Sequence, residues 1–267
     1  MNRIDALFGR LAAEGRSALM PFVTAGDPDL ATTAEVIRAI VAGGADMVEL
    51  GIPYSDPIAD GPVISESYTR ALNRGIKLSA IFDTIAELRI SDEVTPIVAM
   101  VSYAIIHKHG VERFLKRAAE VGFDGLIVPD LPVEESERLA EWASGVKLAL
   151  IQLITPTTPR DRAVRIAKAT TGFIYYVSVA GITGERKALP PDLLETLAWL
   201  RTQTKLPICV GFGVGTPEQI KELAPFADGL IVGSAIVRRF AEDRPKEQLA
   251  AEISRFVAEL AAPLRTR

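Results

Sequence analysis

Eight short apolar runs recur along the chain, and longer segments with the spacing of helices separate them. Each run is apolar enough to be covered on both faces, as the strands of a parallel sheet must be. Eight alternations of strand and helix within 267 residues predict an α/β fold of the (β/α)8 TIM barrel type, which typically takes about 250 residues. The predicted strands are residues 18–24, 46–50, 96–100, 125–128, 147–153, 172–177, 207–210 and 229–232.

A doubly wound open sheet is the competing architecture, but such sheets usually have fewer strands and a glycine-rich first turn, which this sequence lacks. No linker rich in proline, glycine or serine and no run of charge divides the chain. Residues 1–267 are therefore predicted to form a single (β/α)8-barrel domain. Residues 2–14 precede the first strand and are amphipathic, which predicts an extra N-terminal helix that closes the N-terminal end of the barrel.

Similar short sequence motifs stand at the start of three of the predicted strands. They are Gly-Ala-Asp at 44–46, Phe-Asp-Gly at 123–125 and Ala-Asp-Gly at 227–229. The recurrence indicates that one supersecondary unit is used repeatedly.

Charge and composition argue against several classes of function. The net charge is −4 with both signs interspersed, so neither a nucleic acid nor a membrane is expected as a partner. No apolar run approaches the ~18–20 residues that cross a bilayer, and no signal segment opens the chain, so a cytoplasmic location is expected. The single cysteine, Cys209, lies in an apolar run that favours core packing over catalysis.

Glu49, at the end of the second predicted strand, is the strongest catalytic candidate. Functional residues of such a barrel lie at the carboxyl ends of its strands. Period-two alternation places Glu49 on the face opposite to Val48 and Leu50, so it should point into the barrel. A structural ion pair is the alternative, but no lysine or arginine ends a neighbouring strand. Burial without a cation should raise the pKa of Glu49, which suits an acid that later acts as a base.

Two other carboxylates follow strand ends. Asp60 lies in the proline-rich loop after Glu49, and its interpretation as a turn-former has nearly the same weight as a catalytic role. Asp130 lies between two prolines and is either a helix cap or a third carboxylate of the pocket.

Glycines after the last two strands predict a phosphate site. In this fold the loops after strands seven and eight, together with a short helix, usually bind phosphate. Gly211, Gly213 and Gly233 would let backbone N–H groups approach an anion, and a helix beginning at Ser234 would add its positive end. Each glycine alone is better explained by a tight turn, but their shared location favours phosphate binding.

Two absences narrow the chemistry. No lysine ends a predicted strand, so a Schiff-base aldolase lacks its amine, although Lys187 in the sixth loop is a weak reserve. His107 and His109 have no carboxylate beside them, which argues against a metal site. Carbon–carbon bond chemistry here would need a substrate that provides its own electron sink.

Longer motifs identify a resemblance that spans almost the whole chain. Residues 48–62 read Val-Glu-Leu-Gly-Ile-Pro-Tyr-Ser-Asp-Pro-Ile-Ala-Asp-Gly-Pro. Further motifs are Pro-Phe-Val-Thr-Ala-Gly-Asp-Pro at 21–28, Pro-Asp-Leu-Pro at 129–132, Ala-Gly-Ile-Thr-Gly at 180–184, Gly-Phe-Gly at 211–213 and Gly-Ser-Ala at 233–235. Together and in this order they closely resemble the signatures of the tryptophan synthase α subunit family.

The resemblance implies a reaction and roles for its residues. The family cleaves indole-3-glycerol phosphate to indole and glyceraldehyde 3-phosphate without metal or Schiff base, because the indole ring accepts electrons once its C3 is protonated. By resemblance, Glu49 protonates that carbon and takes the proton of the glycerol hydroxyl. Asp60 accepts a hydrogen bond from the indole N–H and contacts Thr183 when the loops close. The other implied substrate-binding residues are Phe22 and Met100 at the indole ring, Tyr175 near Glu49, and Gly184, Gly211, Gly213, Gly233 and Ser234 at the phosphate.

The resemblance also implies a partner. A β subunit carrying pyridoxal phosphate receives indole through a tunnel in an α2β2 heterotetramer, and Pro53 and Asp56 belong to the matching surface. The α subunit itself uses no cofactor. Two alternatives stay open, a stand-alone lyase that releases free indole and a non-catalytic barrel that binds a phosphate ligand. Retention of Glu49 and Asp60 argues against the second.

Overall fold

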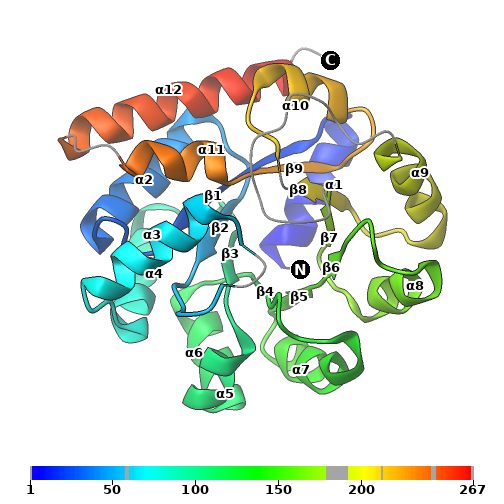
Figure 1. Ribbon diagram of the computed structural model, residues 1–267, viewed down its shortest axis with the longest axis horizontal. Helices are drawn as coiled ribbons and strands as arrows, with labels where there is room; N and C mark the ends of the chain where they lie inside the picture. Colours follow the sequence, from blue (N-terminus) through cyan, green and yellow to red (C-terminus); the bar gives the residue numbers. More distant parts are fainter. Residues whose placement is uncertain (1, 58–59, 179–191, 212, 242–244, 266–267) are drawn as a thin grey trace.

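Parallel strands form an inner ring that helices surround (Figure 1). The computed structural model describes residues 2–57, 60–178, 192–211, 213–241 and 245–265. The strands of its nine-stranded sheet follow the order β5-β4-β3-β2-β1-β9-β8-β7-β6. Their bounds are β1 Ala18–Thr24, β2 Val48–Gly51, β3 Ile97–Met100, β4 Gly125–Ile127, β5 Ala149–Ile151, β6 Leu153–Ile154, β7 Ile174–Val177, β8 Ile208–Gly211 and β9 Gly229–Val232.

The two ends of this order are joined through a single residue, Gln152, so the sheet closes into the predicted barrel. β5 and β6 together occupy the predicted fifth strand, which makes the nine short strands equivalent to eight. The Gln152 side chain donates hydrogen bonds to Ser136 Oγ at 3.1 Å and to the Ala169 carbonyl at 3.3 Å. Every other predicted run also contains a strand, with ends that differ by a few residues.

The helices have recognisable sequence signals at their ends. The Asp29 side chain caps α2, Thr216 and Gln219 form a capping box at α10, and Gly44 ends α2 in the left-handed conformation. The helices are α1 Arg3–Glu14, α2 Leu30–Gly43, α3 Pro62–Asn73, α4 Leu78–Ser91, α5 Tyr103–His109, α6 Val111–Val121, α7 Val133–Gly145, α8 Arg160–Ala169, α9 Leu193–Gln203, α10 Pro217–Leu223, α11 Ser234–Val237, the 3-10 helix η1 Arg238–Ala241, and α12 Lys246–Arg265. No helix in the described ranges is long and apolar enough to cross a membrane.

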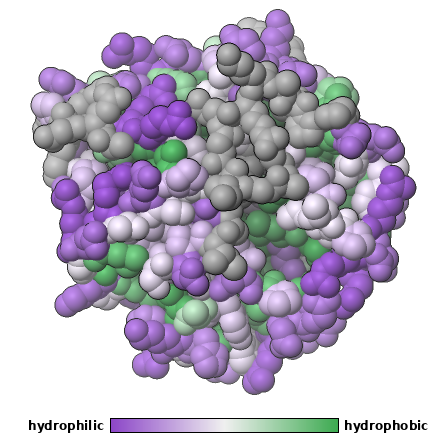
Figure 2. Space-filling view, viewed as in Figure 1, coloured by the Kyte–Doolittle hydropathy of each residue, from purple (hydrophilic) through white to green (hydrophobic). Residues whose placement is uncertain are grey.

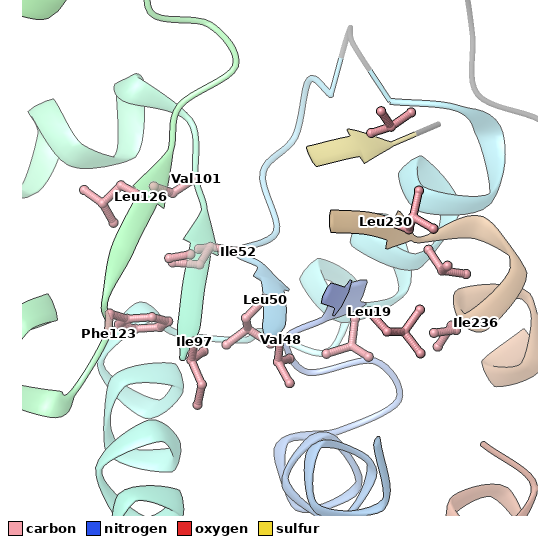
Figure 3. Close-up of a cluster of buried hydrophobic side chains, with 14 of the residues drawn as sticks. Leu19, Val48, Leu50, Ile52, Ile97, Val101, Phe123, Leu126, Leu230 and Ile236 are labelled. Atoms are coloured by element: carbon pink, nitrogen blue, oxygen red, sulfur yellow. The ribbon is translucent and has the colours of Figure 1, made fainter. Parts of the chain in front are cut away.

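Alternation along the strands separates two apolar clusters. The outer cluster packs between the strands and the helices, and Figure 3 shows part of it, including Leu19, Leu50 and Ile97. The inner cluster fills the barrel and includes α1, whose Phe8 ring lies 5.9 Å from that of Phe173. This confirms the predicted N-terminal helix.

The aspartates of the three similar sequence motifs hold the starts of neighbouring strands together. Asp46, Asp124 and Asp228 precede β2, β4 and β9. Each accepts a hydrogen bond from the N–H of a residue in the adjacent strand, Leu19 at 3.0 Å, Ile97 at 2.9 Å and Ile208 at 2.7 Å respectively. Each also pairs with arginine: Arg16 with Asp46, Arg3 and Arg89 with Asp124, and Arg201 with Asp228. The repeated motif therefore has a structural purpose, which is to join neighbouring strands at the N-terminal end of the barrel.

Replacing Asp124 should destabilise the fold strongly. The Asp124 side chain is 3% exposed and pairs with Arg89, which is 10% exposed, so Asp124→Ala leaves a buried guanidinium without its carboxylate. Loss of one partner of a buried pair costs about 3–5 kcal/mol. Urea unfolding should show this loss, whereas Asp83→Ala, which removes an exposed pair with Arg117, should cost less than about 1 kcal/mol. Equal losses in the two variants would contradict the structural purpose assigned to Asp124.

Candidate active site

Glu49 lies inside the barrel, as period-two alternation predicts. Strand register places it between Phe22 of β1 and Val98 of β3. Its side chain is 0% exposed, and neither carboxyl oxygen has a hydrogen-bond partner. Such a group is rare in a protein interior, where buried polar atoms are almost always paired.

The surroundings of Glu49 favour its protonated form. Burial raises the pKa of Glu49 to about 8, and the nearby Asp60 carboxylate adds to the shift. Both causes oppose a negative charge in the cavity, so Glu49 carries its proton at neutral pH.

Asp60 supplies the second carboxyl group of the site, and one of its two oxygens, the buried Oδ2, lacks a hydrogen-bond partner. Burial raises the pKa of Asp60 to about 6, and the Tyr54 hydroxyl acts in the opposite direction. Asp60 is therefore charged at neutral pH while Glu49 is not. Two carboxyl groups with separated pKa values are a common arrangement for acid–base catalysis.

Aromatic rings and glycines shape the cavity around the two acids. A Cβ atom at Gly51 would lie 2.5 Å from Phe22 Cζ and 2.7 Å from the Tyr68 hydroxyl. One at Gly211 would lie 2.5 Å from the Tyr175 hydroxyl. Glycine is thus required at both strand ends for these rings to approach the backbone.

Tyr68 is a member of the site that sequence reasoning missed. It is 0% exposed, its hydroxyl lies 3.8 Å from Met100 Sδ, and its ring centroid lies 5.5 Å from that of Tyr54. Its position on the buried face of α3, just after the loop that carries Asp60, is the signal that points to it.

The structure places most of the predicted phosphate-binding residues at the carboxyl ends of two neighbouring strands. Gly211 ends β8, and Gly233 follows the neighbouring β9 and precedes α11, which begins at Ser234. Gly213 has φ +80°, a left-handed conformation that favours glycine. Thr183, Gly184 and Lys187 lie outside the described residues.

Asp130 caps a helix. Its carboxylate accepts hydrogen bonds from Ser102 Oγ at 2.7 Å and from the Tyr103 N–H at 2.8 Å, at the start of α5. Both predicted interpretations agree with the structure in part, because Asp130 supports the Ser102 cap of α5 and also lines a cavity beside Tyr54.

The described residues contain no group of three or more His, Cys, Asp or Glu side chains that could hold a metal ion. His107 and His109 are exposed in the last turn of α5. Glu49 and Asp60 together are suited to proton transfer to and from a ligand, since one is a protonated acid and the other a carboxylate.

Comparison with known proteins agrees with this geometry. A family model described as "Tryptophan synthase alpha chain" matches residues 8–264. The tryptophan synthase alpha chain of Rhodopirellula baltica is 53% identical over 91% of this chain and 88% of its own. The crystal structure of tryptophan synthase subunit alpha from Legionella pneumophila is 35% identical, with a TM-score of 0.88 over 98% of this chain and 99% of that one.

A complex is also among the similar structures. A chain of the tryptophan synthase complex from Pyrococcus furiosus is 37% identical, with a TM-score of 0.85 over 92% of this chain and 98% of that one. Family model, sequence relatives and solved structures thus agree across nearly the whole length. The chain belongs to the tryptophan synthase alpha chain family.

Proposed function

We propose that this chain is a carbon–carbon lyase that cleaves indole-3-glycerol phosphate to indole and glyceraldehyde 3-phosphate, as the α subunit of tryptophan synthase in tryptophan biosynthesis. One observation carries the proposal beyond family membership. The chain buries a carboxylic acid, Glu49, without any partner, and holds a charged carboxylate, Asp60, beside it. A site whose only purpose was stability would not leave both Glu49 oxygens and Asp60 Oδ2 without hydrogen-bond partners.

The first step is protonation of the indole ring. Glu49 gives its proton to C3 of the indole, and the ring nitrogen takes up the positive charge. The Asp60 carboxylate accepts a hydrogen bond from the indole N–H and stabilises that charge. Because Glu49 and Asp60 Oδ2 are buried away from bulk solvent, this interaction is much stronger than it would be in water.

The second step breaks the carbon–carbon bond. The Glu49 carboxylate removes the proton of the hydroxyl on the adjoining glycerol carbon, and that carbon becomes the aldehyde of glyceraldehyde 3-phosphate. The bonding electrons return to the ring and neutralise its nitrogen. Glu49 ends the cycle with its proton, so the reaction needs no metal or cofactor in this chain.

The remaining predicted residues bind the substrate in this proposal. Phe22 and Met100 line the indole pocket, and Tyr175 orients the substrate near Glu49. Thr183 contacts Asp60 when the loops close. Backbone N–H groups of Gly184, Gly211, Gly213, Gly233 and Ser234 hold the phosphate.

The partner in this proposal is a tryptophan synthase β subunit, in an α2β2 assembly in the cytoplasm, with pyridoxal phosphate only in the β subunit. The similar Pyrococcus furiosus structure is that of a tryptophan synthase complex. The contact surface includes Pro53 and Asp56. A cavity of about 400 Å³ beside them is lined by Tyr54, Ser102 and Asp130, among others.

Figure 2 shows hydrophilic side chains gathered along the outer edge of the face seen there, over the surrounding helices.

Glu49→Gln tests the proposed acid. The amide keeps the shape of the side chain but has no proton to transfer, so indole release from indole-3-glycerol phosphate should fall by about 10²–10⁴-fold, the usual contribution of a general acid. Substrate affinity should change little. Glu66→Gln, on the exposed face of α3, is the matched control and should retain parental activity. Turnover by Glu49→Gln within about tenfold of the parent, or ~1.4 kcal/mol of barrier, would exclude the role.

The pH dependence of kcat/KM should be bell-shaped. Asp60 must be ionised, so activity should rise with pH through about 6. Glu49 must be protonated, so activity should fall as pH rises through about 8. Asp60→Asn should abolish the acidic limb, since only Glu49 then titrates, and move the alkaline limb to lower pH, since the Asp60 charge no longer raises the pKa of Glu49. A rate that continues to rise above the alkaline limit would contradict the assignment of Glu49 as the acid.

Gly213→Ala tests the phosphate site. The φ of +80° at Gly213 is strained for alanine, and a shift of its N–H should weaken inhibition by glycerol 3-phosphate about tenfold or more. Gly75→Ala controls for strain alone, because Gly75 has φ +73° and open space around it in the loop before α4. Equal inhibition of the two variants would place the phosphate elsewhere.

A further inference from the structure

The Tyr68 hydroxyl is a buried polar group with only a poor acceptor. The side chain is fully buried, and its hydroxyl donates to the thioether sulfur of Met100 at 3.8 Å. Thioether sulfur is a weak acceptor, so the hydroxyl gains little there. The phenol of Tyr176, which is also buried but packs in the outer cluster, has the Thr196 side chain as a partner. Tyr68 has only the Met100 sulfur as a partner, whereas Tyr176 has the hydroxyl group of Thr196. The Tyr68 hydroxyl is therefore available to donate to a better acceptor.

Tyr68 extends from α3 toward the loop that carries Asp60. Asp60 and Gly61 immediately precede α3, and the Ser65 side chain donates to the Asp60 carbonyl at 3.3 Å. Side chains on a helix lean toward its N-terminus, which for Tyr68 is the Asp60 end. The hydroxyl also lies 2.7 Å from where a Cβ atom of Gly51 would be, two residues beyond Glu49 on β2.

Donor and acceptor complement each other in this cavity. Asp60 Oδ2 is buried and has no hydrogen-bond partner. After burial, the charge that most strongly raises the pKa of Tyr68 is that of Asp60, ahead of Tyr54 and Glu49. In the structure the hydroxyl rests on Met100, a flexible side chain from which a donor can turn away at little cost.

We propose that Tyr68 is a positioning residue whose hydroxyl donates a hydrogen bond to Asp60 Oδ2 in the substrate complex and thereby aims that carboxylate at the indole N–H. This inference rests on the proposed function, because Asp60 is the group through which Tyr68 acts. Burial keeps the phenol neutral, so it remains a donor throughout the working pH range. A hydrogen bond to the charged form of Asp60 lowers the pKa of that carboxyl and opposes the effect of burial.

Tyr68→Phe removes only the donor. Among the described residues, the other titratable groups that act on this cavity are Glu49, Tyr54, Asp56, Asp130, Tyr175 and Cys209, and the variant leaves all of them in place. At neutral pH kcat/KM should fall roughly 10- to 100-fold, the effect of losing a hydrogen bond to a charged group. The acidic limb of the pH profile should move upward by about one pH unit, and the alkaline limb should stay where it is.

Tyr176→Phe is the matched control, since it also removes one buried tyrosine hydroxyl but outside the barrel interior. It should leave both limbs in place and kcat/KM within about twofold of the parent. In an Asp60→Asn background, Tyr68→Phe should cause no further loss, because its acceptor has lost its charge. Thermal midpoints of the two phenylalanine variants separate effects on folding from effects on the site.

A direct titration distinguishes failure of this inference from failure of the proposed function. Carbon-13 NMR of the Asp60 carboxyl group, with saturating indole, should show a higher pKa in Tyr68→Phe than in the parent. This readout does not need turnover, so an inactive parent would count only against the lyase. An Asp60 titration and an acidic limb that both match those of Tyr176→Phe would overturn the role of Tyr68.

Discussion

The site depends on shielding a carboxylic acid from bulk solvent inside the barrel with no cation beside it. Among the described residues no ion pair involves Glu49 or Asp60, and burial is the largest cause of the raised pKa of each. Arginines pair with Asp46, Asp124 and Asp228 at the opposite end of the strands, where these aspartates hold neighbouring strands in register, and Arg70 pairs with the buried Asp27 in the loop after β1. The arginine pairs of the described residues therefore satisfy structural aspartates and leave Glu49 and Asp60 without a cation.

This separation has a thermodynamic consequence. In the unfolded chain Glu49 loses its proton near its ordinary pKa of 4.5, whereas in the folded chain it keeps the proton up to about 8. As pH rises between these values the unfolded state gains a charge that the folded state does not, so Glu49 increasingly opposes folding. The barrel is stabilised elsewhere, by the hydrogen bonds of Gln152 where the ring closes and by the arginine–aspartate pairs. Neither of these depends on the site. A buried acid that destabilises its own fold is expected where function sets the requirement, which agrees with the role proposed for Glu49.

Much of this arrangement follows from patterns that the sequence displays directly. Apolar runs locate the strands, and period-two alternation fixes the direction of Glu49, because both depend on local spacing. The split of the fifth strand at Gln152 depends on contacts with Ser136 and Ala169 from elsewhere in the chain. Tyr68 was missed for a similar reason: an inventory of strand ends does not include a helix residue whose side chain leans back into the barrel. The repeated aspartates form a visible pattern in the sequence. Their arginine partners do not, because most of them are distant in sequence.

The neighbours of the two acids explain why hydroxyl groups, rather than cations, suit this cavity. A lysine or arginine beside Asp60 would hold it ionised, but its charge would also act on Glu49 and lower the pKa of the acid that must keep its proton. A phenol hydroxyl stabilises a carboxylate only through a short-range, directional hydrogen bond, and it adds no net charge to the cavity. Tyr54 and Tyr68, whose ring centroids lie 5.5 Å apart, can therefore favour the charged form of Asp60 while Glu49 stays protonated. The Tyr54 hydroxyl opposes the effect of burial on the pKa of Asp60, and the hydrogen bond proposed from Tyr68 would act in the same direction.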